Sequence, residues 1–316
     1  SSAASDVYKR QDVFRAVKAI IETVEGSYSV VAMITGWGVI AFRDPHGIRP
    51  LSIGTCEIDG FTETLIASDS VAMKALGFQV ERDVATGEAI VVRMDGTRTS
   101  SICADIPSHT PCIFEFVYFA RPDSRLDGVS VHGARLAMGA KLAERIAKEF
   151  PDHEIDCVIP VPDSGRIAAL ELAMELDIAY REGFVKNRYI GRTFIMPGQD
   201  LRKDSVRKKL NTIKHEFDGR NVLIVDDSIV RGNTSRRIVE MAREAGAKKV
   251  YFASAAPPVV HPNVYGIDMP AKHEYVAHNR TTEEVCQTIG ADWLIYLSLI
   301  HISEPTRRYA ISYAVF

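Results

Sequence analysis

The sequence lacks the features that identify several large classes of protein. Its 316 residues contain five cysteines, an odd number without a CxxC pair, which suits a reducing compartment better than a disulfide framework. No apolar run is long enough to cross a bilayer. The formal net charge of −3 argues against a dedicated nucleic-acid or membrane-surface protein. The nine histidines show no metal-ligand spacing such as HExxH. We therefore expect a cytoplasmic protein that binds neither nucleic acid nor a membrane.

The most informative stretch present is residues 222–235, which read VLIVDDSIVRGNTS. Four apolar β-formers predict a strand that is buried on both faces of a parallel sheet. Asp226 and Asp227 follow at its end, and a turn then leads into a helical pattern that begins near Ser235. Backbone N–H groups at such a strand-to-helix turn form a cup for a phosphate, and the helix dipole assists them.

The side chains around this turn suit two parts of one ligand. Hydroxyls of Thr234 and Ser235 can bond the phosphate, whereas Asp226 and Asp227 would repel it. The aspartates suit sugar hydroxyls or a Mg²⁺ that the ligand carries. The pattern therefore predicts a ribose 5-phosphate site. The alternative is an ordinary turn with a capping serine and exposed acids, and the pattern lacks the Gly-Lys-Ser/Thr ending of a nucleotide-binding P-loop.

A second turn of the same kind occurs at Pro162-Asp163-Ser164-Gly165-Arg166, after a strand expected at 157–161. Ligands gather beyond the carboxyl ends of parallel strands, so we expect both turns to face one crevice. One turn can hold the 5-phosphate and the other a pyrophosphate. Taken alone, Pro-Asp-Ser-Gly is also a generic turn.

Cationic residues lie between the two turns. Lys186, Arg188 and Arg192 are followed by the run RKDSVRKKLN at 202–211. A solvated basic surface is the usual meaning of such a run. The competing interpretation is that these cations stabilise the charge that grows on a departing pyrophosphate.

The remaining pattern predicts two regions. Residues 12–108 read as β-rich, with an amphipathic helix around residues 14–24 and a second helix at 68–78 capped by Ser68 or Ser70. Residues 109–297 alternate strand and helix, which indicates a parallel sheet with helices on both faces. The expected order there is strand 157–161, helix 166–177, strand 222–225, helix 235–245, strand 249–255 and strand 292–297.

The 222–235 pattern resembles the 5-phosphoribosyl 1-pyrophosphate (PRPP) signature of type I phosphoribosyltransferases. Three further segments resemble amidophosphoribosyltransferases, the glutamine-dependent family that opens purine synthesis: FEFVYFARPDS at 114–124, FVKNRYIGRTFIMPG at 184–198 and NVYGIDMP at 263–270. The resemblance runs from about Val13 to about Tyr296. Asn233 stands where the family usually has Thr, and asparagine tolerates left-handed turns and still hydrogen-bonds phosphate.

The resemblance implies an α/β fold, in which a type I phosphoribosyltransferase sheet at 109–297 follows part of an N-terminal-nucleophile (α+β) glutaminase domain at 12–108. Residues 1–11 and 298–316 resemble translated sequencing-adapter sequence. A disordered native start is the alternative for residues 1–11. We therefore expect a fragment that lacks both ends of the longer enzyme.

The resemblance also assigns roles to single residues. PRPP binding is expected at Asp226, Asp227, Ser228, Val230, Arg231, Gly232, Asn233, Thr234, Ser235, Asp163, Ser164 and Lys186. Arg192 and Lys209 match catalytic cations of a loop that closes over PRPP. Ser164, Asp226 and Asp227 match positions close to Mg²⁺. Tyr118 lies where the family passes ammonia between sites, with a core aromatic as the alternative.

The implied reaction transfers an amino group to PRPP, giving 5-phosphoribosylamine and pyrophosphate. The family's glutaminase uses an N-terminal cysteine, whereas Cys56 and Cys103 are internal, so this chain is expected to use ammonia and not glutamine. Other PRPP-handling enzymes, such as a salvage transferase or a PRPP synthetase, and a non-catalytic PRPP-binding module remain alternatives.

The expected cofactor is Mg²⁺. Some relatives carry an iron–sulfur cluster, and Cys112 matches one of its ligands, but Asn263 stands at another ligand position, so no cluster is expected. Cys112 is more simply a small buried hydrophobe. Purine nucleotides are expected inhibitors, and the complete enzyme is expected to be a homo-oligomer.

Overall fold

The structure is a computed structural model that describes residues 2–187, 210–262 and 272–298, with side chains described from Asp12 onward. The chain divides into two compact units. The amino-terminal unit is formed mainly by residues 1–131, and the carboxy-terminal unit mainly by the residues from His132 onward. Each unit has its own buried core.

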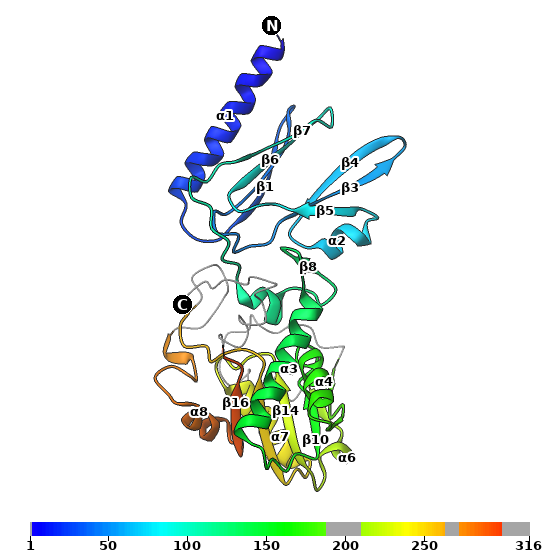
Figure 1. Cartoon of the computed structure of the whole chain (residues 1–316), viewed down its shortest axis with the longest axis vertical. Helices are drawn as coiled ribbons and strands as arrows, with labels where there is room; N and C mark the ends of the chain where they lie inside the picture. Colours follow the sequence, from blue (N-terminus) through cyan, green and yellow to red (C-terminus); the bar gives the residue numbers. More distant parts are fainter. Residues whose placement is uncertain (1, 188–209, 263–271, 299–316) are drawn as a thin grey trace. The chain divides into compact units, whose positions relative to one another are not determined.

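The amino-terminal unit contains a four-stranded antiparallel sheet with the strand order β1-β2-β6-β7 (Figure 1). The strands are β1 (Ser29–Ile34), β2 (Gly38–Arg43), β6 (Glu88–Arg93) and β7 (Arg98–Ile102). Helix α1 (Ser2–Thr23) packs on this sheet through Val17, which is buried against Phe42 and Val91. The amphipathic face expected at 14–24 is confirmed for Phe14, Val17 and Ile21, whereas Ile20 and Val24 are exposed.

A second, three-stranded antiparallel sheet has the order β4-β3-β5. Its strands are β3 (Ser52–Ile58), β4 (Phe61–Ala67) and β5 (Gln79–Asp83). Ile53 of β3 lies in one core cluster with Ala41 and Ile90 of the first sheet. The two sheets therefore share a core, as stacked sheets do.

The helix expected at 68–78 is present as α2 (Ser70–Ala75), but the expected cap is wrong. The carboxylate of Asp69 accepts a 2.8 Å hydrogen bond from the N–H of Val71 and so caps the helix. Ser68 precedes the cap position and Ser70 is already helical. All three residues are good caps by type, and the chain geometry selects the aspartate.

A buried arginine joins the sheets to a hairpin of the same unit. The hairpin consists of β8 (Arg125–Leu126) and β9 (Val129–Ser130), with Asp127 in its turn. Arg43 is 1% exposed and donates hydrogen bonds of 2.6 and 2.9 Å to the two carboxylate oxygens of Asp127. The imidazole of His109 lies 3.1 Å from the same carboxylate. Arg43 also donates to the carbonyl oxygens of Gly47, Arg49 and Val84.

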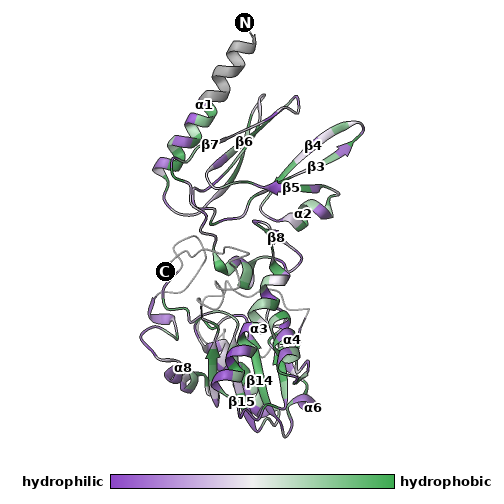
Figure 2. Cartoon of the chain, in the orientation of Figure 1, coloured by the Kyte–Doolittle hydropathy of each residue, from purple (hydrophilic) through white to green (hydrophobic). Residues whose placement is uncertain are grey.

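The carboxy-terminal unit is built on a five-stranded sheet with the order β11-β10-β14-β15-β16, and all four pairings are parallel. The strands are β10 (Cys157–Pro160), β11 (Ala179–Tyr180), β14 (Asn221–Asp226), β15 (Lys249–Ser254) and β16 (Trp293–Tyr296). Figure 2 shows β14 as hydrophobic, as expected of a strand buried on both faces. The parallel sheet predicted from the sequence is confirmed.

The connections of this sheet reverse direction at its centre. From β10 the chain passes through α4 (Arg166–Glu175) to β11 on one side. From β14 it passes through α7 (Asn233–Glu244) to β15, and through α8 (Thr282–Ile289) to β16, on the other side. Right-handed crossovers then place α4 on one face and α7 with α8 on the other. The carboxyl ends of β10 and β14 form a topological switch point, where such sheets bind ligands.

The other described elements of this unit are α3 (Val131–Glu149), β12 (Phe184–Lys186), β13 (Leu210–Thr212), α6 (Lys214–Phe217) and the 3-10 helix η2 (Lys272–Glu274). Strands β12 and β13 form an antiparallel pair. Helices α4 and α7 lie where the sequence predicts helices, whereas α3 and α8 were not individually expected. Helix α3 packs closely on α4, since a Cβ atom at Gly139 would lie 2.3 Å from the carbonyl oxygen of Ala168.

We predict that Asp127 makes the stability of the amino-terminal unit depend on acid pH. Burial raises its pKa, but hydrogen bonds from Arg43 and His109 outweigh burial and lower the pKa to about 2, from an ordinary 3.8. A lowered folded-state pKa contributes stability above pH 3.8, and that stability is lost as the pH falls through 2. The contribution is about 2 kcal/mol.

Urea unfolding followed by fluorescence of Trp37, in a Trp293→Phe background, measures this unit. Asp127→Asn should cost about 2 kcal/mol at pH 5, because it leaves Arg43 buried without its partner charge, as protonation of Asp127 does. It should also flatten the loss of stability between pH 4 and pH 2. The control is Asp123→Asn, which breaks an exposed ion pair with Arg121 and should change little. Equal effects of the two substitutions would contradict the prediction.

Candidate functional site

The two predicted anion-binding turns lie together at the switch point. The residues after β10 run alongside the end of β14, since the N–H of Val161 donates a 2.8 Å hydrogen bond to the carbonyl oxygen of Val225. A Cβ atom at Gly165 would lie only 2.4 Å from that same oxygen. Only glycine fits at this contact. The Pro-Asp-Ser-Gly sequence is therefore a turn packed against the signature strand, and we call residues 162–165 the pyrophosphate loop for the role predicted from its sequence.

The side chains of the two turns also lie close together. The carboxylate of Asp227 accepts a 2.7 Å hydrogen bond from the hydroxyl of Ser228, and the hydroxyl of Ser164 is near enough to lower the pKa of Asp227. Asp227 is 8% exposed. Burial raises its pKa, and the two hydroxyls and the positive charge of Arg135 lower it, which leaves the pKa above its ordinary value. The two turns are adjacent, as expected of turns that face one crevice.

Asp226 is a second buried carboxylate beside the first. It is 8% exposed, and its carboxylate accepts a 2.9 Å hydrogen bond from the N–H of Asp227. Burial and then the charge of Asp227 raise the pKa of Asp226 well above its ordinary value. Two adjacent carboxylates that are poorly solvated favour an incoming hydroxyl donor or cation.

The turn after this pair is held in place by residues 274–276. The carbonyl oxygen of Val230 is held by the N–H of Val276, and the guanidinium of Arg231 bonds Glu274 at 2.8 Å. Gly232 has a left-handed φ of 75° and directly precedes α7. The helix begins at Asn233, two residues earlier than the sequence suggested.

The first residues of α7 are the expected phosphate contacts. Asn233 and Thr234 are exposed, and Ser235 is 3% exposed. The N–H groups of a first helical turn have no partner within their own helix. With the helix dipole, these N–H groups and the hydroxyl of Thr234 form an anion-binding site of the kind predicted.

Lys186 lies beside the pyrophosphate loop. Its ammonium group is 2.7 Å from the carboxylate of Asp163, and Arg166 lies 3.2 Å from the same carboxylate. Arg166 also bonds Glu182. These pairs are about half exposed, and such pairs contribute little to stability. An anion in the loop can therefore compete with Asp163 for both cations.

The side chains at the switch point suit a Mg²⁺ ion that is bound together with the phosphates of a ligand. Mg²⁺ takes oxygen ligands and is usually held by one or two carboxylates together with substrate phosphates. Asp226, Asp227 and the hydroxyl of Ser164 supply such oxygens. Within residues 12–187, 210–262 and 272–298, no group of three or more His, Cys, Asp or Glu could hold a metal by itself.

The other predicted residues lie outside the described residues or in the amino-terminal unit. Arg192, Lys209 and Asn263 lie outside the described residues, so their predicted roles stay predictions. Tyr118 lies in the π-helix η1 (Glu115–Phe119), is 38% exposed and contacts the ring of Phe119 edge to face. That exposure does not suit a core aromatic. Cys112 is 2% exposed, as expected of a small buried hydrophobe.

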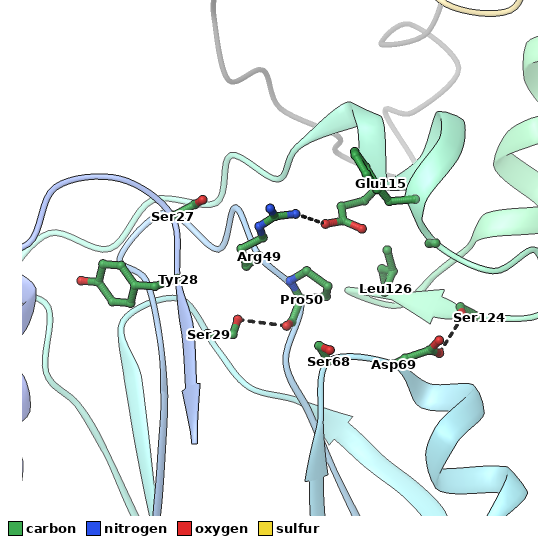
Figure 3. Close-up of a pocket in the computed structure, with 12 residues that line it drawn as sticks. Ser27, Tyr28, Ser29, Arg49, Pro50, Ser68, Asp69, Glu115, Ser124 and Leu126 are labelled. Atoms are coloured by element: carbon green, nitrogen blue, oxygen red, sulfur yellow. Dashed lines mark hydrogen bonds and ion pairs between the residues drawn. The ribbon is translucent and has the colours of Figure 1, made fainter. Parts of the chain in front are cut away.

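A separate pocket of about 520 Å³ lies within the amino-terminal unit (Figure 3). Arg49 and Glu115 form a 2.9 Å ion pair in its wall, and Ser124 donates a 2.8 Å hydrogen bond to Asp69. Burial raises the pKa of Glu115 above its ordinary value, against the effect of Arg49. The polar groups of the pocket wall are thus paired with each other, Arg49 with Glu115 and Ser124 with Asp69. These pairs do not indicate a particular ligand.

Arg135 is a site residue that the sequence interpretation missed. It lies on α3, is 5% exposed, and its charge acts on Asp227. A signal was present in the sequence. Residues 131, 135, 138 and 142 have helical spacing, and Arg135 is the single charged residue among three apolar ones. A charge on the apolar face of a helix indicates a buried partner charge.

Comparison with known proteins identifies the family. The profile described as the phosphoribosyl transferase domain matches residues 129–293, a span of just over half the chain that includes both turns. The chain belongs to the phosphoribosyltransferase family.

This phosphoribosyltransferase chain is similar to proteins named amidophosphoribosyltransferase. It is 59% identical to that of Pseudomonas aeruginosa over 289 residues, 56% identical to that of Escherichia coli over 297, and 52% identical to that of Saccharomyces cerevisiae over 293. These alignments cover 92, 94 and 92% of this chain and 58, 59 and 58% of those proteins. The chain thus spans less than two thirds of the length of these curated relatives.

A solved structure gives the same result. The glutamine PRPP amidotransferase of B. subtilis, complexed with ADP and GMP, matches with a TM-score of 0.81 at 40% identity. The match covers 92% of this chain and 62% of that one. The resemblance to amidophosphoribosyltransferases stated from the sequence is confirmed.

We predict that Gly165→Ala destabilises the carboxy-terminal unit of this phosphoribosyltransferase chain. The new methyl group would meet the backbone oxygens of Val225 and Val161, and neither can move without shifting a strand end. The expected loss is about 1–3 kcal/mol. Fluorescence of Trp293, which stacks on Phe150 and Tyr251, reports unfolding of this unit in a Trp37→Phe background. Ser164→Ala in the same loop adds no such clash and is the control. An unchanged midpoint for Gly165→Ala would show that the loop does not pack on β14.

Proposed function

We propose that this chain contains the phosphoribosyltransferase part of an amidophosphoribosyltransferase. The complete enzyme would transfer an amino group to PRPP, giving 5-phosphoribosylamine and pyrophosphate, as the first step of de novo purine synthesis. One observation carries the proposal: the signature turn and the pyrophosphate loop meet at the switch point, where the N–H of Val161 bonds the carbonyl oxygen of Val225 and Gly165 packs on that oxygen. The similarity to amidophosphoribosyltransferases supports an amino group as the acceptor.

Different residues of the site bind different parts of PRPP. The N–H groups at the start of α7 and the hydroxyls of Thr234 and Ser235 hold the 5-phosphate. The carboxylates of Asp226 and Asp227 accept hydrogen bonds from the ribose hydroxyls. The pyrophosphate loop holds the leaving group, and a bound Mg²⁺ would neutralise part of its charge. Ammonia is neutral and nucleophilic, so the reaction needs positioning and electrostatic stabilisation rather than a strong base.

The leaving pyrophosphate needs further positive charge. We assign that role to Arg192 and Lys209, which lie outside the described residues, and to Lys186. Lys186 supports the assignment because its ammonium group already bonds Asp163 in the pyrophosphate loop. Charge that grows as the bond to pyrophosphate breaks is stabilised most in the transition state, so loss of these cations lowers turnover.

Residues 12–108 are assigned to the rear part of a glutaminase domain. Two antiparallel sheets with a shared core support this assignment. Neither Cys56 nor Cys103 has a free amine beside its thiol, and burial raises the pKa of Cys103, which disfavours the reactive thiolate. The chain as it stands is therefore proposed to use ammonia only.

We also propose how the complete enzyme is regulated and where it acts. The B. subtilis structure is a complex with ADP and GMP, which supports purine nucleotides as inhibitors here. We also propose a homo-oligomeric, cytoplasmic enzyme in its complete form. No helix in the described part of the chain is long and apolar enough to span a membrane. Inhibition of the ammonia-dependent reaction by ADP and GMP together tests the regulatory proposal.

The central test compares two nitrogen donors. The purified chain with PRPP and Mg²⁺ should form phosphoribosylamine and pyrophosphate when ammonium is added, but not when glutamine is added. Release of pyrophosphate and of glutamate are followed separately. Glutamate release would show that a glutamine nucleophile is present. Transfer to a purine base in place of ammonia would favour the alternative, a salvage phosphoribosyltransferase, and PRPP binding without any transfer would favour a non-catalytic module.

The same assay tests the assigned cations with a matched pair of variants. Lys209→Ala should lower the ammonia-dependent turnover by more than about tenfold, because one full charge is lost beside the leaving group. Lys214→Ala removes an exposed lysine only five positions further along and should leave turnover unchanged. Equal turnover in the two variants would remove Lys209 from the mechanism.

A further inference from the structure

The pyrophosphate loop carries an anion of its own. The carboxylate of Asp163, the second residue of the loop, lies between two cations. Its Oδ2 atom accepts a 2.7 Å hydrogen bond from the ammonium group of Lys186, and its Oδ1 atom accepts a 3.2 Å hydrogen bond from Nη1 of Arg166. Each carboxylate oxygen thus bonds a different cation. Two oxygens of a phosphate group can bond the same two side chains in the same way.

Arg166 is held in place independently of Asp163. Its Nε and Nη2 atoms each lie 3.1 Å from a different carboxylate oxygen of Glu182. The hydroxyl of Tyr180 donates a 2.7 Å hydrogen bond to Oε1 of the same carboxylate. A two-pronged contact of this kind fixes the plane of a guanidinium. The Nη1 atom of Arg166 therefore stays directed at the loop when the carboxylate of Asp163 moves away.

The backbone that carries these side chains is packed, whereas the side chains themselves can change partners. A Cβ atom at Gly183 would lie 2.7 and 2.8 Å from two ring atoms of Phe217, so the chain before β12 is pressed onto the core. Lys186 is the last residue of β12, which pairs with β13. The charged side chains are about half exposed: 58% for Asp163, 44% for Arg166 and 52% for Lys186.

The charges of this cluster cancel in the free protein. The carboxylates of Asp163 and Glu182 balance the cations of Lys186 and Arg166. A multiply charged anion gains little from such a neutral group unless one carboxylate gives way. Exposed ion pairs are weak, so the release of Asp163 costs little, and phosphate oxygens form strong hydrogen bonds with the same cations.

We propose that the carboxylate of Asp163 is an intramolecular competitor of pyrophosphate, which holds Lys186 and Arg166 in the free protein and releases both when the ligand binds. Arg166 is then a second cation for the pyrophosphate group, and Glu182 orients it. This inference rests on the proposed function, because it takes the pyrophosphate group of PRPP as the ligand. The competitor also weakens binding of free pyrophosphate, which favours release of this product.

Calorimetric titration of the full chain with inorganic pyrophosphate and Mg²⁺, at one fixed ionic strength, tests the inference. Asp163→Asn keeps the size of the side chain and removes its charge, so it should tighten pyrophosphate binding by about threefold to tenfold. Ribose 5-phosphate should bind the variant within about twofold of wild type, because it occupies the other turn. The control Glu154→Gln removes a charge that pairs with Lys249, at the amino end of β15, and should leave both affinities unchanged.

A double-mutant cycle tests the role of Arg166. Arg166→Gln should weaken pyrophosphate binding by about threefold or more, and the fold-loss should be larger in the Asp163→Asn background, because the guanidinium then has no competing carboxylate in the loop. The control Lys249→Gln removes a cation at the opposite end of the sheet and should leave pyrophosphate binding unchanged.

The sign of the effect of Asp163→Asn decides the matter. Pyrophosphate binding that is unchanged, weaker or absent in this variant overturns the inference, since an aspartate that bound the ligand or its Mg²⁺ would lose affinity on neutralisation. Arg166→Gln with wild-type affinity overturns it as well. If Asp163→Asn does not fold, Asp163→Ser replaces it. Tighter pyrophosphate binding without any phosphoribosylamine from PRPP and ammonium overturns the proposed function, and the competition at the loop stands.

Discussion

The close approach of the pyrophosphate loop to the end of β14 is the contact on which the site depends. The hydrogen bond from Val161 to Val225 and the lack of space for a Cβ atom at Gly165 hold the loop against the signature strand. Two turns far apart in sequence thereby lie side by side at the ends of β10 and β14. The strand order makes this contact possible, because β10 and β14 are neighbours whose connections leave in opposite directions.

Charge is the second constraint, and it explains why the site suits an anionic sugar. Asp226 and Asp227 are buried side by side, and their pKa values are raised because the free protein solvates them poorly. Hydroxyl donors of a ribose, or a cation that accompanies its phosphates, relieve that cost. The phosphates themselves need positive partners, which the first turn of α7 provides at one end. Lys186, beside the pyrophosphate loop, provides one at the other end.

Sequence patterns predicted those parts of the structure that depend on residues close together in the sequence. The strand at 222–225, its two aspartates and the following turn are encoded by neighbouring residues, and the parallel sheet follows from the alternation of strands and helices. Arg135 could not be assigned in the same way, because its burial depends on the packing of α3 on α4, which the residues next to it in sequence do not encode. The prediction of the residue that caps α2 was wrong for a different reason. Ser68, Asp69 and Ser70 are all residue types that cap helices, and the path of the backbone places Asp69 at the cap position. Asp163 bonds Lys186 and Arg166, a contact that motif matching does not reveal.

Competition between the parts of PRPP and the whole molecule tests the one-site arrangement most directly. In titrations with Mg²⁺, ribose 5-phosphate and pyrophosphate should bind together, one molecule of each per chain, because each occupies a different turn. PRPP should then bind one per chain and displace both, since it carries both groups on one sugar. If PRPP left either fragment bound, or if the two fragments excluded each other, the two turns would not form a single PRPP site.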